Sequence, residues 1–179
     1  LGVCDDTLKI VFSFIENSTT PLVLDADALN CVAKQPEILL RKKAPIIITP
    51  HPGEMSRLTG LATPLVNAER ERVALDFAQK YGVVTVLKGA GTVIASPNGK
   101  VLVNPTGNSG MATGGSGDVL AGMTASILAQ GASPFSSAAA AVYLHGLAGD
   151  IAAEKYGKIS MLPTDLINCI PLAYKRCGF

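Results

Sequence analysis

Two hydrophobic patterns alternate along the first half of the chain. Continuous apolar runs predict three buried strands of a parallel sheet, at residues 21–25, 45–49 and 83–87. Apolar residues at helical spacing predict helices around these runs, at residues 8–17, 28–32, 37–41 and 67–81. Because strands that alternate with helices are typical of an α/β fold, we expect layers of helices around a mostly parallel sheet.

The second half of the chain is richer in small residues. A hairpin is predicted from the runs at 92–95 and 100–103, which flank a turn at Ser96–Gly99. A glycine-rich loop follows at residues 104–117. Three helices are predicted after it: residues 118–130, residues 134–153 and a last helix from about Pro163, with Thr164 as its N-cap. Helices this rich in Ala and Gly are expected to pack close to each other or to another stretch of backbone.

Composition indicates one domain with an ample core. The chain has 179 residues, of which 48% are hydrophobic and 16% are charged. Its 15 Lys and Arg residues nearly balance 14 Asp and Glu residues, and this net charge of +1 argues against a broad nucleic-acid surface. No apolar run reaches the ~18 residues of a membrane helix, and no signal peptide is visible. We therefore expect no membrane partner and a cytoplasmic location.

The cysteines and histidines do not indicate a metal centre. The four cysteines contain no CxxC pair and are expected to be free thiols of a reducing compartment: Cys4, Cys31, Cys169 and Cys177. With only two histidines and no acidic cluster, a protein-held transition metal is not expected. His145 lies within an Ala-rich predicted helix, where a structural role is expected.

The glycine-rich loop that leads into the helix at Asp118 is the most informative stretch. Its five glycines leave main-chain N–H groups free to converge on an anion: Gly107, Gly110, Gly114, Gly115 and Gly117. The N-terminus of the following helix suits a phosphate. Since a carboxylate would repel that phosphate, we interpret Asp118 as a base that takes a proton from an attacking hydroxyl. The alternative is an aspartate that only caps the helix.

Other glycine-loop motifs do not fit this stretch. The chain has no GxxxxGK[ST] sequence, which excludes a P-loop. A dinucleotide fingerprint would need glycine at position 120, where the chain has Leu120. A nucleophile elbow around Ser116 would need glycine in place of Asp118. The loop is therefore interpreted as an anion site of another kind.

Three further motifs follow predicted strands, at the edge where ligands of open α/β sheets gather. In Lys88-Gly-Ala-Gly-Thr92 the glycines allow close backbone approach, so that Lys88 or Thr92 can reach a phosphate or ribose; a plain turn is the alternative. His51 lies between two prolines, a rigid setting that costs little entropy to hold; the alternative is an ordinary loop with an exposed histidine. Asp25 and Asp27 either help to hold a Mg²⁺–phosphate group, or Asp27 only caps the next helix.

Taken together and in this order, these motifs resemble the ADP/ATP-dependent NAD(P)H-hydrate dehydratases, a family with a ribokinase-like fold. The motifs that carry the resemblance are DADALN at 25–30, TPHPGEMSRL at 49–58, KGAGT at 88–92 and GNSGMATGGSGDVLAG at 107–122. It extends from Leu1-Gly2, which is similar to the end of the family's GPGLG loop, to Met161–Asp165. The resemblance implies that residues 1–179 are the C-terminal portion of a single ribokinase-like domain, and we expect its N-terminal part to be absent from this chain.

The resemblance also implies an activity that the residues alone do not reveal. Such enzymes repair hydrated NADH or NADPH of the S configuration: a nucleotide phosphorylates the added ring hydroxyl, and elimination of phosphate restores the double bond. Asp118 is similar to the family's catalytic aspartate, which also contacts the substrate, and Gly2 and His51 match further substrate contacts. The residues that match nucleotide-binding positions are Lys88, Gly89, Ala90, Gly91, Thr92 and Gly117.

The family resemblance further implies Mg²⁺ together with ADP or ATP, and a homo-oligomer, often a tetramer. The HPGE sequence at 51–54 is similar to that of bacterial members, which mostly use ADP. Two other functions stay open at this point. A sugar or vitamin-precursor kinase of the same fold would stop at the phosphorylated product, although DADALN and HPGE favour the dehydratase. The second open function is a non-catalytic nucleotide-binding module, but the presence of Asp118 and of the glycines argues against it.

Overall fold

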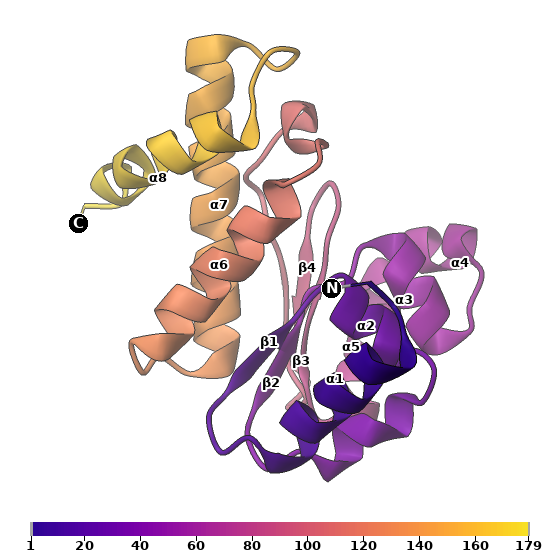
Figure 1. Ribbon diagram of the computed structural model, residues 1–179. Coiled ribbons are helices and arrows are strands. Elements are labelled where there is room, and N and C mark those ends of the chain that lie inside the picture. The colour runs from indigo at the N-terminus through magenta and orange to yellow at the C-terminus, as the bar shows by residue number, and fades with distance from the viewer. Residues whose placement is uncertain (1, 179) are drawn as a thin grey trace.

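The computed structural model describes residues 2–178, in which a five-stranded sheet lies between two layers of helices (Figure 1). The strands lie side by side in chain order: β1 (Leu22–Leu24), β2 (Ile46–Ile48), β3 (Val84–Leu87), β4 (Val93–Ala95) and β5 (Val101–Val103). β1, β2 and β3 pair in parallel, and β4 pairs antiparallel with both β3 and β5. Only β4 of these five strands is therefore reversed, which confirms the mostly parallel sheet.

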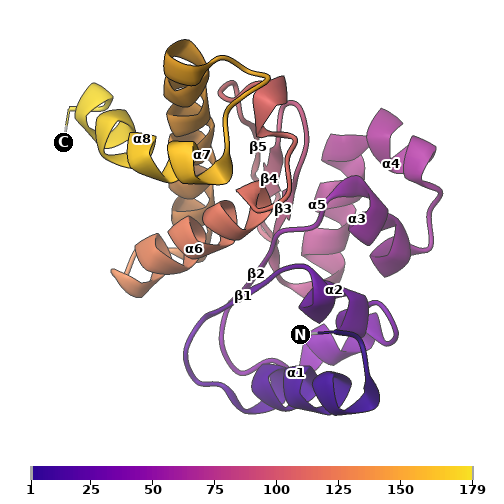
Figure 2. The same cartoon turned by 45° about the horizontal axis from the view of Figure 1, so that its top comes forward.

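The two helical layers come from different halves of the chain (Figure 2). One face carries α1 (Asp5–Asn17), α2 (Asp27–Val32), the 3₁₀ helix η1 (Pro36–Arg41), α3 (Pro52–Thr59), α4 (Thr63–Ala68) and α5 (Arg70–Tyr81). The other carries α6 (Ser116–Ala129), α7 (Pro134–Tyr156) and α8 (Pro163–Arg176), and a short 3₁₀ helix, η2 (Ser109–Met111), precedes α6. Among residues 2–178, no helix combines the length and apolarity that crossing a membrane requires.

The central strands are buried on both faces, as their continuous apolar runs predict. In β2, Ile46 and Ile48 pack in the core beneath α1–α5, whereas Ile47 packs in the core beneath α6–α8. All three side chains are essentially inaccessible to solvent. Because side chains of a strand alternate between faces, this single run joins two separate hydrophobic cores.

The region around residues 50–81 differs from the sequence prediction in two ways. Residues 52–59, for which the sequence analysis predicts no helix, form helix α3, which has Pro52 at its first position. His51 is the N-cap of this helix, and a reciprocal hydrogen bond with Glu54 three residues later closes a capping box. The helix predicted over 67–81 is in fact two helices, α4 and α5, which a non-helical Glu69 separates.

The N-termini of two later helices also differ from the prediction. Thr164 is not the N-cap of α8, because the helix starts at Pro163 and Asp165 accepts a hydrogen bond from the main-chain N–H of Leu162. α6 begins at Ser116 rather than Asp118, and its N-cap is Gly115, which has φ of 94°. Asp118 is the third residue of α6 and makes no side-chain cap, so the capping interpretation of Asp118 is wrong.

The expected close packing of the small-residue helices is confirmed on α7. A Cβ at Gly146 would collide with Thr106, and one at Gly149 would collide with Met111. Both partners belong to the glycine-rich loop, which therefore lies directly on the backbone of α7. All four cysteines are free thiols, as predicted: Cys4 and Cys177 exposed, Cys31 and Cys169 buried.

Candidate active site

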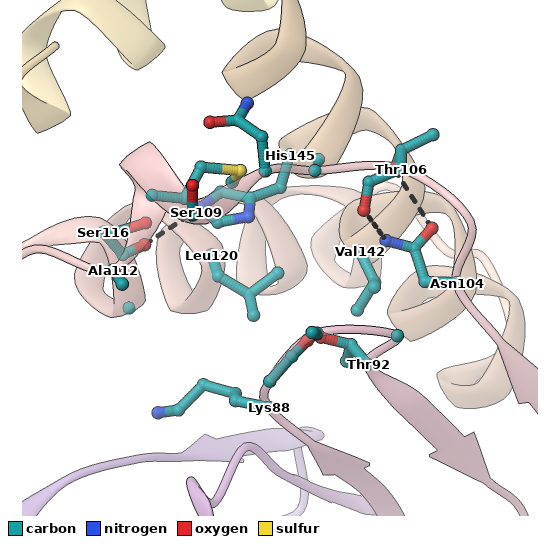
Figure 3. Close-up of a pocket in the computed structure, with 18 of the residues that line it drawn as sticks. Lys88, Thr92, Asn104, Thr106, Ser109, Ala112, Ser116, Leu120, Val142 and His145 are labelled. Carbon is teal, nitrogen blue, oxygen red and sulfur yellow. Dashed lines mark hydrogen bonds between the residues drawn. The ribbon is translucent and has the colours of Figure 1, made fainter. Parts of the chain in front are cut away.

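A pocket of about 720 Å³ opens at the carboxyl end of the parallel strands (Figure 3). Its floor is the loop that follows β3, and its walls are the glycine-rich loop, the N-terminus of α6 and one side of α7. The sequence-predicted site residues that line it are His51, Lys88, Gly89, Ala90, Gly91, Thr92, Gly107 and Gly117. Three motifs far apart in the sequence thus border one cavity, at the sheet edge where ligands of α/β folds bind.

The floor of the pocket is a tight turn that presents main-chain N–H groups. Gly89 has φ of 147° and Gly91 has φ of 63°, both in the region that favours glycine. The N–H groups of Gly89, Ala90 and Gly91 donate to no acceptor within residues 2–178. The Thr92 hydroxyl donates to the carbonyl of Gly89 (3.0 Å) and closes the turn. Free donors at such a turn suit a phosphate or another anion.

The glycine-rich loop is fixed to α7 by polar contacts that sequence reasoning missed. Asp150 accepts from the main-chain N–H of Gly107 (2.9 Å) with one carboxylate oxygen and from the Asn108 amide (2.9 Å) with the other. The Asn108 amide also donates to the carbonyl of Gly149 (3.0 Å). The loop is consequently held in shape before any ligand binds. No local signal identifies Asp150, which lies 42 positions after Asn108 in the chain.

The N-terminus of α6 approaches a lysine–carboxylate cluster through Gly117. A Cβ on Gly117 would lie 3.6 Å from Lys88 Nζ and 3.8 Å from an oxygen of Asp25. Asp118 follows in the chain but is exposed and is not among the residues that line the pocket. Asp118 is therefore not the only carboxylate near the glycine-rich loop, since Asp25 lies there as well.

Lys88 is the cation of this cluster and is already paired. Its Nζ donates to Asp25 Oδ1 at 2.7 Å and lies 3.8 Å from Glu54 Oε2. All three side chains are at least four-fifths buried, so their charges interact through little water. A phosphate that contacts Lys88 must therefore share it with Asp25. Glu54 was missed as a site residue, although its place three residues after His51 is the capping-box spacing.

His51 is oriented by the start of α3. Its Nδ1 accepts from the main-chain N–H groups of Gly53 (3.0 Å) and Glu54 (3.3 Å). Nδ1 must therefore be unprotonated, which leaves the proton of the neutral ring on Nε2, 3.3 Å from Glu54 Oε1. A Cβ at Gly53 would lie 2.9 Å from the ring, so a side chain at this position would displace His51. His51 thus meets the pocket as a hydrogen-bond donor.

The other histidine combines a structural contact with a place in the pocket wall. His145 on α7 is buried, and its Nε2 lies 3.0 Å from the carbonyl of Ser116, the first residue of α6. Burial lowers the pKa of His145 to about 4, so the ring is neutral and its Nε2–H donates to that carbonyl. This bond ties α6 to α7 beside the pocket, in agreement with the expected structural role.

Asp27 and Gly2 contact each other rather than the pocket. The main-chain N–H of Gly2 donates to Asp27 Oδ2 at 2.8 Å and lowers the pKa of that carboxyl. Asp27 is not the cap of α2, because the N-cap is Ala26, which has φ of 50°. Neither Gly2 nor Asp27 lines the pocket described above. The segment that resembles the end of the family's GPGLG loop also includes Leu1, which lies outside the described residues.

Known proteins share this arrangement. The sequence model of the NAD(P)H-hydrate dehydratase family matches residues 1–172. The bifunctional NAD(P)H-hydrate repair enzyme of Moorella thermoacetica is 45% identical over 170 residues, which are 95% of this chain and 32% of that protein. The ADP/ATP-dependent NAD(P)H-hydrate dehydratase of Bacillus subtilis, co-crystallised with ATP and Mg²⁺, superposes with a TM-score of 0.89 at 35% identity, over 98% of this chain and 61% of that one.

A second solved structure agrees on the fold. A ribokinase-like superfamily protein from Enterococcus faecalis superposes with a TM-score of 0.82 at 30% identity, over 98% of this chain and 60% of that one. The chain thus has the ribokinase-like architecture, although it spans less than two thirds of the length of each of these three relatives. With the family match over residues 1–172, the chain belongs to the NAD(P)H-hydrate dehydratase family.

Proposed function

We propose that this chain contributes the catalytic site of an ADP- or ATP-dependent dehydratase that returns the S epimer of hydrated NADH or NADPH to the reduced dinucleotide. The observation that carries the proposal is the single pocket bordered by the Lys88–Thr92 turn, the glycine-rich loop and His51. The names of the relatives from Moorella and Bacillus support the same reaction. The HPGE sequence favours ADP as the donor.

In the proposed first step, the added hydroxyl of the nicotinamide ring attacks the terminal phosphorus of the nucleotide. The oxygen–phosphorus bond to the leaving nucleotide breaks, and the hydroxyl proton passes to the carboxylate of Asp118. The N–H groups of Gly89, Ala90 and Gly91, with those at the start of α6, stabilise the charge on the phosphate oxygens. Exposure of Asp118 leaves it accessible to a substrate that enters from solvent.

In the second step the bond between the ring carbon and the ester oxygen breaks and phosphate leaves, the neighbouring ring carbon loses a proton to water, and the ring double bond forms again. His51 is proposed to donate its Nε2–H to the hydrated nicotinamide, and Gly2 to contact it through the backbone. The contact of Gly2 with Asp27 holds this part of the chain near the end of β1.

The donor set fits a magnesium ion that arrives with the nucleotide. Among residues 2–178, no group of three His, Cys, Asp or Glu side chains is placed to hold a metal alone. Mg²⁺ is usually held by one or two carboxylates together with substrate phosphates, and Asp25 and Glu54 supply such a pair beside Lys88. Asp27, the second carboxylate that the sequence suggested for this role, accepts from the main-chain N–H of Gly2. An ion held by Asp25 and Glu54 would supply positive charge against the transferring phosphate.

Oligomer and location are proposed from the family and from chemistry. We propose a homo-oligomer, a tetramer, as the family resemblance implies. A cytoplasmic location is supported by the exposed free thiols of Cys4 and Cys177, which suit a reducing compartment.

The decisive assay follows the recovery of NADH absorbance from the hydrated S epimer with ADP or ATP and Mg²⁺. The dehydratase should release phosphate and NADH in equal amounts. A kinase of the same fold would consume nucleotide and accumulate a phosphorylated product without NADH. A nucleotide-binding module would bind ADP and consume none. Either of these two results would contradict the proposal.

A further inference from the structure

The turn that forms the floor of the pocket has a cation behind it. Arg70, the first residue of α5, donates from its guanidinium to the carbonyls of Leu87 (2.9 Å) and Gly91 (3.3 Å). These two carbonyls lie at the beginning and the end of the turn. Arg70 does not line the pocket, and α5 lies on the face of the sheet opposite α6 and α7 (Figure 1). The guanidinium therefore holds the turn from the side away from any ligand.

Arg70 lies so close to Gly89 that any side chain at position 89 would displace the guanidinium. A Cβ at Gly89 would lie 2.5 Å from one terminal nitrogen of Arg70 and 3.0 Å from the other. Only the thickness of the backbone thus separates the guanidinium from the pocket. This explains why glycine is needed at position 89 beyond its φ of 147°.

The charge of Arg70 is not neutralised by a carboxylate. Within residues 2–178 it makes no ion pair, and its buried Nε has no acceptor. Burial lowers the pKa of Arg70, yet a guanidinium stays protonated. Lys88, by contrast, is paired with Asp25. Behind the turn, then, the uncompensated positive charge comes from Arg70.

We propose that Arg70 is the positioning residue of the nucleotide site: it fixes the Lys88–Thr92 turn through both ends and places an unpaired positive charge behind Gly89, which favours a phosphate group in front of it. The inference rests on the proposed function, because it assigns a nucleotide phosphate to this turn. Arginine suits the role because one terminal nitrogen of its rigid, planar guanidinium donates to both carbonyls, whereas a lysine ammonium rotates freely and fixes this geometry less well.

The test measures ADP binding by calorimetry at several salt concentrations, in the full-length protein. Arg70→Gln removes the charge and should weaken ADP binding about tenfold, the effect expected for one lost charged hydrogen-bond group, and should flatten the salt dependence. Arg70→Lys keeps the charge and should weaken binding less, with the salt dependence retained. In turnover, both should raise KM for the nucleotide more than they lower kcat.

Arg72→Gln is the matched control. Arg72 lies on the same helix and is exposed, and it pairs with Glu69 at the surface. This variant should bind ADP as the unaltered protein does. If Arg70→Gln and Arg70→Lys match Arg72→Gln in affinity and salt dependence, the proposal is overturned.

Hydrogen exchange of the ligand-free protein gives a readout that needs no nucleotide. Both Arg70 variants should exchange the amide of Lys88, which donates to the carbonyl of Pro50, faster while β3 and β4 stay protected. A uniform increase across the sheet would mean general destabilisation and would overturn a positioning role. A protein that binds ADP but restores no NADH would contradict the proposed function alone, and one that binds no ADP would contradict the assignment of phosphate to this turn.

Discussion

Lys88 Nζ lies 2.7 Å from Asp25 Oδ1, although the two residues are 63 positions apart in the chain. Asp25 directly follows β1 and Lys88 directly follows β3, and Glu54, from the helix after β2, completes the cluster. Each of the three parallel strands therefore delivers one charged side chain to the same edge of the sheet. The cluster is a direct product of the parallel topology.

Removal of the lysine from this cluster should destabilise the protein more than removal of the aspartate. Lys88→Met leaves the carboxylates of Asp25 and Glu54 close together without a cation and should cost about 3 kcal/mol or more. Asp25→Asn leaves Lys88 with Glu54 and should cost about 1–2 kcal/mol. Urea unfolding measures the loss of stability in both variants. A larger loss in Asp25→Asn than in Lys88→Met would contradict the interpretation that Lys88 compensates both carboxylates.

Asp118→Asn should lower turnover by about 10²–10⁴, the usual effect of losing a general base. The amide cannot accept the hydroxyl proton, while it preserves size. Affinity for the nucleotide should hold or improve, since one negative charge near the phosphates is gone. Stability should change little because Asp118 is exposed and makes no cap. Recovery of NADH at the wild-type rate would remove Asp118 from the mechanism.

Gly91→Ala should weaken nucleotide binding and also cost about 1–2 kcal/mol of stability, because alanine is strained at a φ of 63°. Gly99→Ala is the matched control, since Gly99 has φ of 88° in the turn between β4 and β5, away from the pocket. It should show a similar loss of stability with unchanged affinity for ADP. Equal affinity in the two variants, measured by calorimetry, would remove Gly91 from the nucleotide site.

His145 predicts an acid-dependent loss of stability. Its pKa is lowered from 6.5 to about 4 in the folded protein, so the unfolded chain binds the proton more readily between these values. The contribution of His145 to the free energy of unfolding should be fully present above pH 6.5. It should be lost as the pH drops toward 4, by up to about 3 kcal/mol at ~1.4 kcal/mol per pH unit.

His145→Gln should reduce the difference in unfolding free energy between about pH 7 and about pH 5, because the titrating group is gone. His51→Gln, at the exposed histidine, is the control and should retain most of the difference. An unchanged difference in the His145 variant would mean that other groups cause the acid sensitivity.

The parts of the structure that local patterns encode were predicted well. The run at 45–49 identified β2, and the glycine-rich stretch with Lys88–Thr92 identified two borders of the pocket. Helix α3 was not predicted, although Pro52 occupies a first helical position that needs no N–H. Long-range contacts such as Arg70 with Leu87 and Asp150 with Asn108 have no signal in spacing, since only the folded sheet brings these residues together.

The two turns that flank β4 should differ in their tolerance of insertions. The Lys88–Thr92 turn is held at its ends by Arg70, and the N–H of Lys88 donates to the carbonyl of Pro50 (2.8 Å). An added residue there would break one of these bonds or shift the register of β4 on β3. The turn at Ser96–Gly99 closes only on itself and Lys100 and is exposed at its tip, so length variation among natural relatives should concentrate there.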